Sequence, residues 1–137
     1  MIIDPSKLDP TSVYKLLIGS VVPRPIAWAS TVSPEGVANL APYSFFTVAS
    51  RNPPTLCISV GERLDGEPMP KDTLRNVEET GEFVVNVVSL PLSDAMHESA
   101  KEHPPGADEF EAAGLTAAPC EVVKAPRVLE AAVSMEC

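Results

Sequence analysis

The chain has 137 residues, of which 45% are hydrophobic, and a net charge of −9 from 10 Lys and Arg against 19 Asp and Glu. This length fits one globular domain spanning residues 1–137, and the acidic excess argues against a nucleic-acid partner. No apolar run approaches the roughly 18 residues that a membrane span needs, and the N-terminus lacks the pattern of a signal peptide. We therefore expect a cytoplasmic protein with no membrane attachment.

The three cysteines point to an intracellular protein without a disulfide framework. Cys57, Cys120 and Cys137 are odd in number, far apart and without a Cys-x-x-Cys spacing, so neither disulfides nor a zinc site is expected. Cys57 lies in the apolar run 56–60, which predicts a buried structural thiol. We expect no metal site.

The first half of the chain predicts one helix followed by short strands. Asp9 can cap a helix over 11–17 that has Pro10 at its first position and Gly19 as its stop. The apolar runs that follow are rich in β-branched and aromatic residues, which favour strands. The predicted strands are 26–32, 37–40, 45–49 and 55–60, with a turn over 33–36 between the first two.

The second half mixes helices and strands. Asp72 can cap a helix over 73–80, and Gly81 can end it. The other predicted elements are a central strand over 83–88, helices over 93–101 and 108–113, and late strands over 121–124 and 132–136. Short antiparallel strands with inserted helices indicate a mainly-β small barrel, and no Gly-rich dinucleotide fingerprint is present.

Residues 39–46 are the first candidate for a binding site. The proline at position 42 kinks a predicted strand and presents backbone N–H and C=O groups at an edge, where a flat heteroaromatic ring could be read with help from Asn39 and Ser44. The alternative is an ordinary strand corner with Tyr43 and Phe45 in the core.

Two further stretches could bind an anion. Lys71 and Thr73 flank the start of a predicted helix, which makes a phosphate seat, although a plain helix cap is the alternative. Arg24 stands between two prolines and could pair with a phosphate or carboxylate, although a surface arginine beside a core Trp28 is the alternative.

The remaining polar groups predict no catalytic side chain. His97 and His103 lack the partners of a triad or metal site and are expected to face solvent. The acidic run 108–111 is expected to be a solvated helix face with Phe110 buried.

In their order and spacing, these stretches resemble the flavin reductase-like, FMN-binding split-barrel family, close to flavoredoxin and to the reductase components of two-component flavin monooxygenases. The resemblance rests on segments at 23–28, 39–46, 71–76, 83–86, 108–115 and 135–137. It implies a homodimer of Greek-key split barrels with one FMN per subunit. The cofactor-binding positions that it implies are Arg24, Trp28, Ser30, Thr31, Asn39, Ala41, Pro42, Tyr43, Ser44, Phe45, Ser59, Lys71 and Thr73.

The resemblance also implies a reaction. NAD(P)H would pass a hydride to the flavin, which carries the chemistry, and the reduced flavin or its electrons would go to a monooxygenase or another acceptor. The alternatives are a flavin- or haem-binding electron carrier or sensor without NAD(P)H turnover of its own and a structural domain that has lost its cofactor. Because family members continue past the equivalent of Cys137, the last barrel strands are expected to be missing and the domain to be truncated at its C-terminus.

Overall fold

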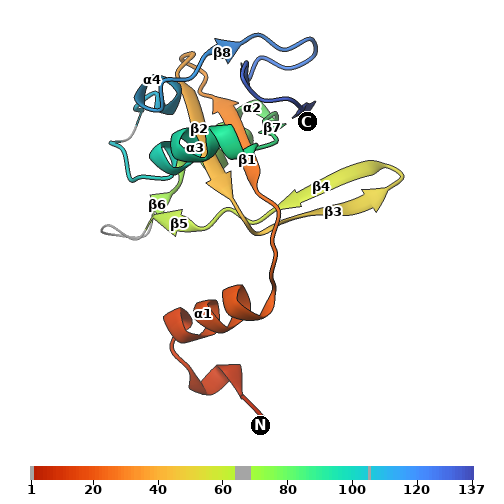
Figure 1. Ribbon diagram of the computed structural model, residues 1–137, viewed down its shortest axis with the longest axis vertical. Coiled ribbons are helices and arrows are strands. Elements are labelled where there is room, and N and C mark those ends of the chain that lie inside the picture. Colours follow the sequence, from red (N-terminus) through yellow and green to blue (C-terminus); the bar gives the residue numbers. More distant parts are fainter. Residues whose placement is uncertain (1, 64–68, 105) are drawn as a thin grey trace.

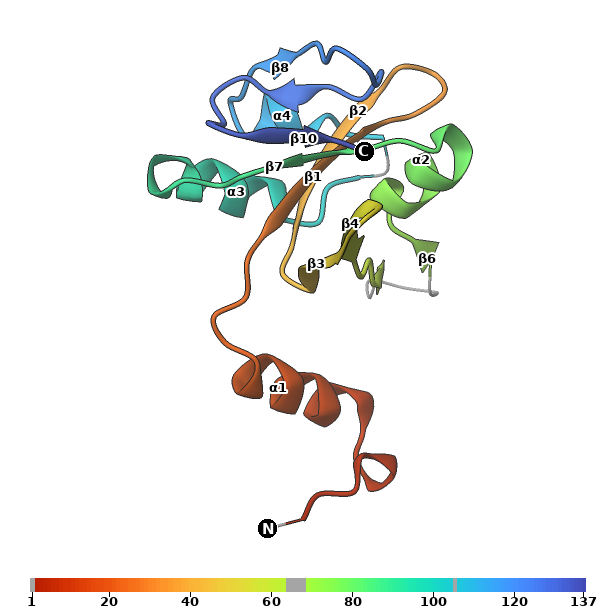
Figure 2. The same ribbon diagram turned by 90° about the vertical axis from the view of Figure 1, so that its right-hand side faces the viewer.

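The computed structural model describes residues 2–63, 69–104 and 106–137. Most elements gather in one body, whereas helix α1 (Pro10–Ser20) stands apart from it on an extended link (Figures 1 and 2). No residue of α1 is buried. Among the described residues, no helix is long and apolar enough to cross a membrane.

A four-stranded antiparallel sheet forms the centre of the body. Its order is β10-β7-β1-β2, formed by Ser134–Glu136, Val84–Asn86, Ala27–Val32 and Ala38–Tyr43. Ser30 lies opposite Leu40 and Thr31 opposite Asn39 in the β1–β2 pair. The turn between these strands closes where the Gly36 N–H donates to the Ser33 carbonyl over 2.9 Å, with φ of 89° at Gly36, a conformation that glycine adopts without strain.

The two faces of this sheet have different partners. Trp28, Leu40, Met96, Phe110 and Val128 form the apolar core on one face. On this side lie helices α3 and α4 and strand β9, formed by Ser93–Ser99, Glu109–Ala112 and Arg127–Val128. Helix α2 (Asp72–Thr80) packs on the other face, so the sheet is the middle layer of the body.

Smaller elements complete the chain. A hairpin of β3 (Phe46–Arg51) and β4 (Pro54–Ile58) projects from the body (Figure 1). The remaining elements are short strands and single turns. They are η1 (Pro5–Lys7), β5 (Glu62–Arg63), β6 (Met69–Pro70), η2 (Leu90–Leu92) and β8 (Ala117–Ala118).

Much of the local prediction is confirmed. Antiparallel sheets with several helices match the expected mainly-β class. Asp9 caps α1 by accepting from the Ser12 N–H over 3.0 Å, and Gly81 ends α2 in the left-handed conformation. The predicted helix end was wrong, because α1 continues past residue 17 and through Gly19 to Ser20.

Three other predictions are corrected. Lys71, not Asp72, is the N-cap of α2, and Asp72 instead forms an ion pair of 2.7 Å with Arg75. Cys57 is exposed, because it lies on the projecting hairpin. Residues 121–124 form no strand.

Carboxylates explain the missing strand at 121–124. Glu136 accepts the backbone N–H groups of residues 121, 122 and 123 over 3.1, 2.6 and 3.1 Å. Glu82 accepts those of Lys124 and Ala125 over 2.6 and 3.0 Å. With its donors satisfied by side chains, this segment needs no neighbouring strand.

Candidate functional site

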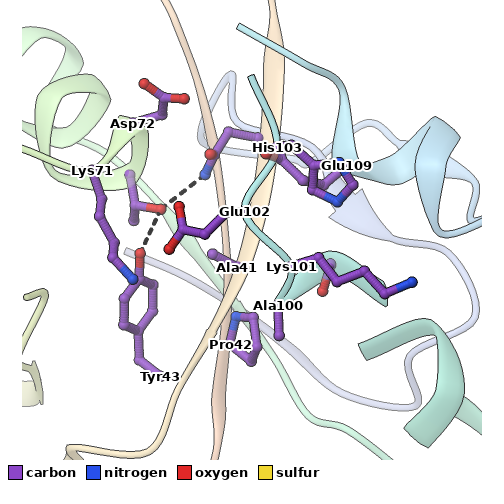
Figure 3. Close-up of a pocket in the computed structure, with 13 residues that line it drawn as sticks. Ala41, Pro42, Tyr43, Lys71, Asp72, Ala100, Lys101, Glu102, His103 and Glu109 are labelled. Carbon is purple, nitrogen blue, oxygen red and sulfur yellow. Dashed lines mark hydrogen bonds between the residues drawn. The ribbon is translucent and has the colours of Figure 1, made fainter. Parts of the chain in front are cut away.

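A pocket lies beside β2, between the N-terminus of α2 and the segment that joins α3 to α4 (Figure 3). Its empty space, counted together with the open mouth, is about 490 Å³. Its lining is more polar than the sheet interior. The lining residues are Asn39, Ala41, Pro42, Tyr43, Lys71, Asp72, Thr73, Ser99, Ala100, Lys101, Glu102, His103 and Glu109.

The α2 side of the pocket offers hydrogen-bond donors. Lys71 is half-buried and extends into the pocket near Tyr43 (Figure 3). Among the described residues, its ammonium has neither an ion pair nor a hydrogen bond. The N-terminus of α2 has no side-chain cap there either. A cation next to an uncapped helix start is a favourable place for an anion.

The Thr73 hydroxyl lies at the centre of this donor group. Its oxygen accepts a hydrogen bond from the Asn39 amide and another from the Tyr43 hydroxyl, each over 2.9 Å. The dashed lines in Figure 3 mark these bonds. Thr73 is only 3% exposed, so the hydroxyl is held in one place by neighbours from β2.

The opposite side of the pocket contains a buried acid. Glu109 is 7% exposed and accepts the Leu40 N–H of β2 over 3.1 Å. Burial raises the pKa of its carboxyl group, and the hydrogen bond from Leu40 opposes this rise. The prediction that the acidic run is a solvated face was therefore wrong at Glu109, whereas Phe110 is buried as expected.

The histidine predictions have different outcomes. His97 is exposed, as expected. His103 is half-buried, lines the pocket, and places its Nε2 atom 3.2 Å from the Glu98 carbonyl. Lys101, which follows the end of α3, forms an ion pair with Glu98. Lys71, in contrast, lines this pocket without a partner among the described residues.

Six predicted site residues meet in this pocket, although they come from two separate stretches of sequence. They are Asn39, Ala41, Pro42, Tyr43, Lys71 and Thr73.

Three others line a second groove between α1 and the start of β3. They are Arg24, Ser44 and Phe45. Arg24 donates from Nη1 to the carbonyls of Ile18 and Val21 over 2.6 and 2.7 Å, and its guanidinium lies 5.9 Å from the centre of the Phe45 ring. In this arrangement Arg24 caps the end of α1 rather than facing the pocket with Lys71.

The last four predicted residues lie away from both cavities. Trp28, Ser30 and Thr31 of β1 are completely buried, and the Trp28 indole N–H donates to the Ser99 hydroxyl over 2.9 Å. Ser59 is exposed, and its N–H donates to the Phe45 carbonyl over 2.9 Å. The three β1 residues would therefore influence a ligand through the residues that they support.

Sequence reasoning missed the far wall of the pocket. Glu102 and His103 follow α3 in a region without a motif of its own, whereas Glu109 belongs to the segment 108–115 that carries part of the resemblance but was given no role in the site. The local signal was the capping residue Asp108, which accepts the Phe110 N–H over 2.9 Å and so places Glu109 in the first turn of α4.

Comparison with known proteins identifies the family to which this chain belongs. Residues 18–137 match the family model described as a flavin reductase like domain. The chain therefore belongs to the flavin reductase-like family.

Individual relatives agree with this assignment. An uncharacterised protein of Aquifex aeolicus is 51% identical over 129 residues, which cover 94% of this chain and 65% of the relative. Nitrilotriacetate monooxygenase component B from Bacillus cereus is 42% identical with a TM-score of 0.92, covering 100% of this chain and 66% of that one. 2-Nitrobenzoate 2-nitroreductase from Pseudomonas fluorescens is 34% identical with a TM-score of 0.87, covering 100% of this chain and 64% of that one.

More distant structures share the fold. A Shewanella frigidimarina protein described as a flavin reductase with a split barrel domain has a TM-score of 0.79 at 23% identity, covering 96% of this chain and 63% of that one. The chain thus spans just under two thirds of the length of the Aquifex aeolicus protein and of the Bacillus cereus component B.

Proposed function

We propose that this chain binds FMN, with the phosphate group between Lys71, Thr73 and the N-terminus of α2. The observation that carries this proposal is the half-buried Lys71 ammonium without a partner among the described residues, beside an uncapped helix start. A phosphate group would accept hydrogen bonds from both Lys71 and Thr73. The residues present therefore fit the anionic end of this cofactor.

The flat ring of the cofactor would lie along the edge of β2. Ala41, Pro42 and Tyr43 line the pocket, and the chain then continues through Ser44 and Phe45 to the second groove. A ligand with an anionic end and an aromatic end would find polar donors near α2 and apolar or aromatic groups near α1. This arrangement supports FMN over a small anion alone.

We further propose that the protein serves as an NAD(P)H-dependent flavin reductase. A bound flavin would supply the redox chemistry by taking a hydride, that is two electrons and a proton, from reduced nicotinamide. The protein would orient the ring and leave one face open. Membership of the flavin reductase-like family supports this activity, as does the likeness to a monooxygenase component B, which also makes a monooxygenase a candidate acceptor of the reduced flavin.

We propose that the protein acts as a homodimer. Tyr14, Leu17 and Val21, on and next to α1, are 53%, 50% and 57% exposed, and α1 stands away from the body (Figure 2). Apolar side chains on a projecting helix favour contact with a second chain.

The experiment that tests this function measures binding and turnover on the same preparation. The purified protein is titrated with FMN, and the oxidation of NADH and NADPH is then followed with and without FMN. FMN-dependent oxidation supports a reductase; bound FMN without oxidation supports an electron carrier; and no binding refutes the flavin site. Lys71→Ala should weaken FMN binding, whereas Lys101→Ala, on the other side of the pocket and paired with Glu98, serves as the matched control.

A further inference from the structure

The hydrogen bonds around Thr73 determine where its hydroxyl proton can point. A threonine hydroxyl has one proton to donate and two lone pairs that accept. The Asn39 amide and the Tyr43 hydroxyl both donate to the Thr73 oxygen over 2.9 Å. With the Tyr43 hydroxyl as the donor, both acceptor positions are used, and the Thr73 proton points away from Asn39 and Tyr43.

Within the described part of the chain, no acceptor takes the Thr73 proton. Thr73 is 3% exposed and lines the pocket beside Lys71. A buried donor without an acceptor is unfavourable. A ligand that offers an acceptor atom at this position would remove that cost.

A second layer of hydrogen bonds fixes the Asn39 amide. Its nitrogen also donates to the Thr31 hydroxyl over 3.2 Å, so both of its protons are used. The Asn76 amide of α2 donates to the same Thr31 oxygen over 3.0 Å. Asn39, Thr31 and Asn76 are 6%, 0% and 2% exposed. Little freedom remains for these groups to turn, since each is held by a neighbour on another element.

We propose that Asn39 and Tyr43 are positioning residues that direct the Thr73 proton toward the anionic end of the ligand. This inference rests on the proposed FMN site. Because the Thr73 oxygen already accepts two hydrogen bonds, the Thr73 hydroxyl can only donate to a ligand. A hydroxyl that can only donate favours a ligand group that only accepts. A phosphate dianion is such a group, whereas a hydroxyl or an amine brings protons of its own. Asn39 and Tyr43 thus contribute to ligand selection without touching the phosphate.

The test compares the affinities for FMN and riboflavin, which differ by the phosphate. Tyr43→Phe removes one donor to Thr73, which frees a lone pair and allows the hydroxyl to turn. We expect this variant to lose about 2- to 12-fold in FMN affinity, the scale of one neutral hydrogen bond. The loss for FMN should exceed any loss of riboflavin affinity, because riboflavin has no phosphate to accept the Thr73 proton and phenylalanine keeps the aromatic ring that lines the pocket.

A double-mutant cycle separates positioning from a general structural role. Thr73→Val should lower FMN affinity by about 10- to 150-fold, the scale of a hydrogen bond to a charged group. In that background Tyr43→Phe should cause no further loss specific to FMN, because the proton that it directs is absent. Thr73→Ser keeps the hydroxyl and should retain the preference for FMN. If Thr73→Val does not fold, Thr73→Ala takes its place in the cycle.

Two results would overturn the proposal while leaving the FMN site intact. One is an equal loss of FMN and riboflavin affinity in Tyr43→Phe. The other is that Tyr43→Phe causes the same FMN-specific loss in the Thr73→Val background as in the unmodified protein. Equal affinities of the unmodified protein for FMN and riboflavin would instead refute the phosphate seat itself, and the positioning role with it.

Discussion

Replacing Glu109 by glutamine is expected to remove a pH dependence from the stability of this protein. Burial raises the pKa of the Glu109 carboxyl group, so the folded chain holds this proton more tightly than the unfolded chain does. The free energy of unfolding therefore falls as the pH rises from the unfolded value of about 4.3 through the higher folded pKa. Glutamine cannot ionise, and this fall should disappear.

The hydrogen bond between Glu109 and Leu40 determines how far Glu109→Gln and Glu109→Ala differ in stability. Glutamine keeps an oxygen that can accept the Leu40 N–H, so Glu109→Gln should match or exceed the stability of the unmodified protein near neutral pH. Glu109→Ala leaves that N–H without an acceptor beside the buried Leu40 side chain. It should have a free energy of unfolding about 1–3 kcal/mol lower than that of Glu109→Gln at all pH values.

Urea unfolding followed by tryptophan emission measures both effects across a range from about pH 4.5 to 8. Glu111→Gln is the matched control, because Glu111 lies on the same helix and is exposed. If Glu109→Gln were as unstable as Glu109→Ala throughout this range, the carboxylate charge would itself be needed in the folded state. Burial of the Glu109 carboxyl group would then not be the source of a pH-dependent loss of stability.

Three other predictions test the site and the sheet. Lys71→Ala should weaken FMN binding by roughly 1.5–3 kcal/mol and leave riboflavin binding unchanged in a fluorescence titration, since it removes a charge-assisted contact to the phosphate; equal losses would place the phosphate elsewhere. The emission of Trp28, the only tryptophan, should be quenched at saturating FMN, and unchanged emission would contradict a site beside this sheet. Asn86→Ala should lower the unfolding free energy by about 3 kcal/mol or more, because the completely buried amide forms hydrogen bonds with Trp28, Ser30, Val128 and Ser134. Calorimetry tests this, with Asn52→Ala at an exposed position as the control.

The features that sequence predicted well depend on neighbouring residues. Asp9 caps a helix three residues from the N–H that it accepts, and Gly81 ends a helix by its own backbone conformation. Lys71 and Thr73 were grouped for the same reason, because they are two residues apart at a helix start, and they do line one pocket; their binding of a phosphate stays a prediction. Such patterns are determined within one or two turns of the chain.

The features that sequence could not predict depend on distant partners. Residues 121–123 have the composition of a strand, but their N–H groups bind Glu136, at least 13 residues away. Glu109 looks like a surface acid until α4 packs against β2 and brings its carboxylate to Leu40. Cys57 belongs to an apolar run that the fold places on a projecting hairpin. In each case, a tertiary contact overrides the local pattern.

The outer edge of β2 explains why the pocket lies where it does. In a strand, N–H groups two residues apart point to the same side, so Leu40 and residue 42 share the edge that faces away from β1. The Leu40 N–H is taken by Glu109, and Pro42 has no N–H to offer. An additional strand would find no available donor at either position, which closes this edge to further pairing. The fold thus keeps the space beside Ala41 and Tyr43 free of protein strands, and Lys71 and Thr73 of the neighbouring helix start line that same space with donors.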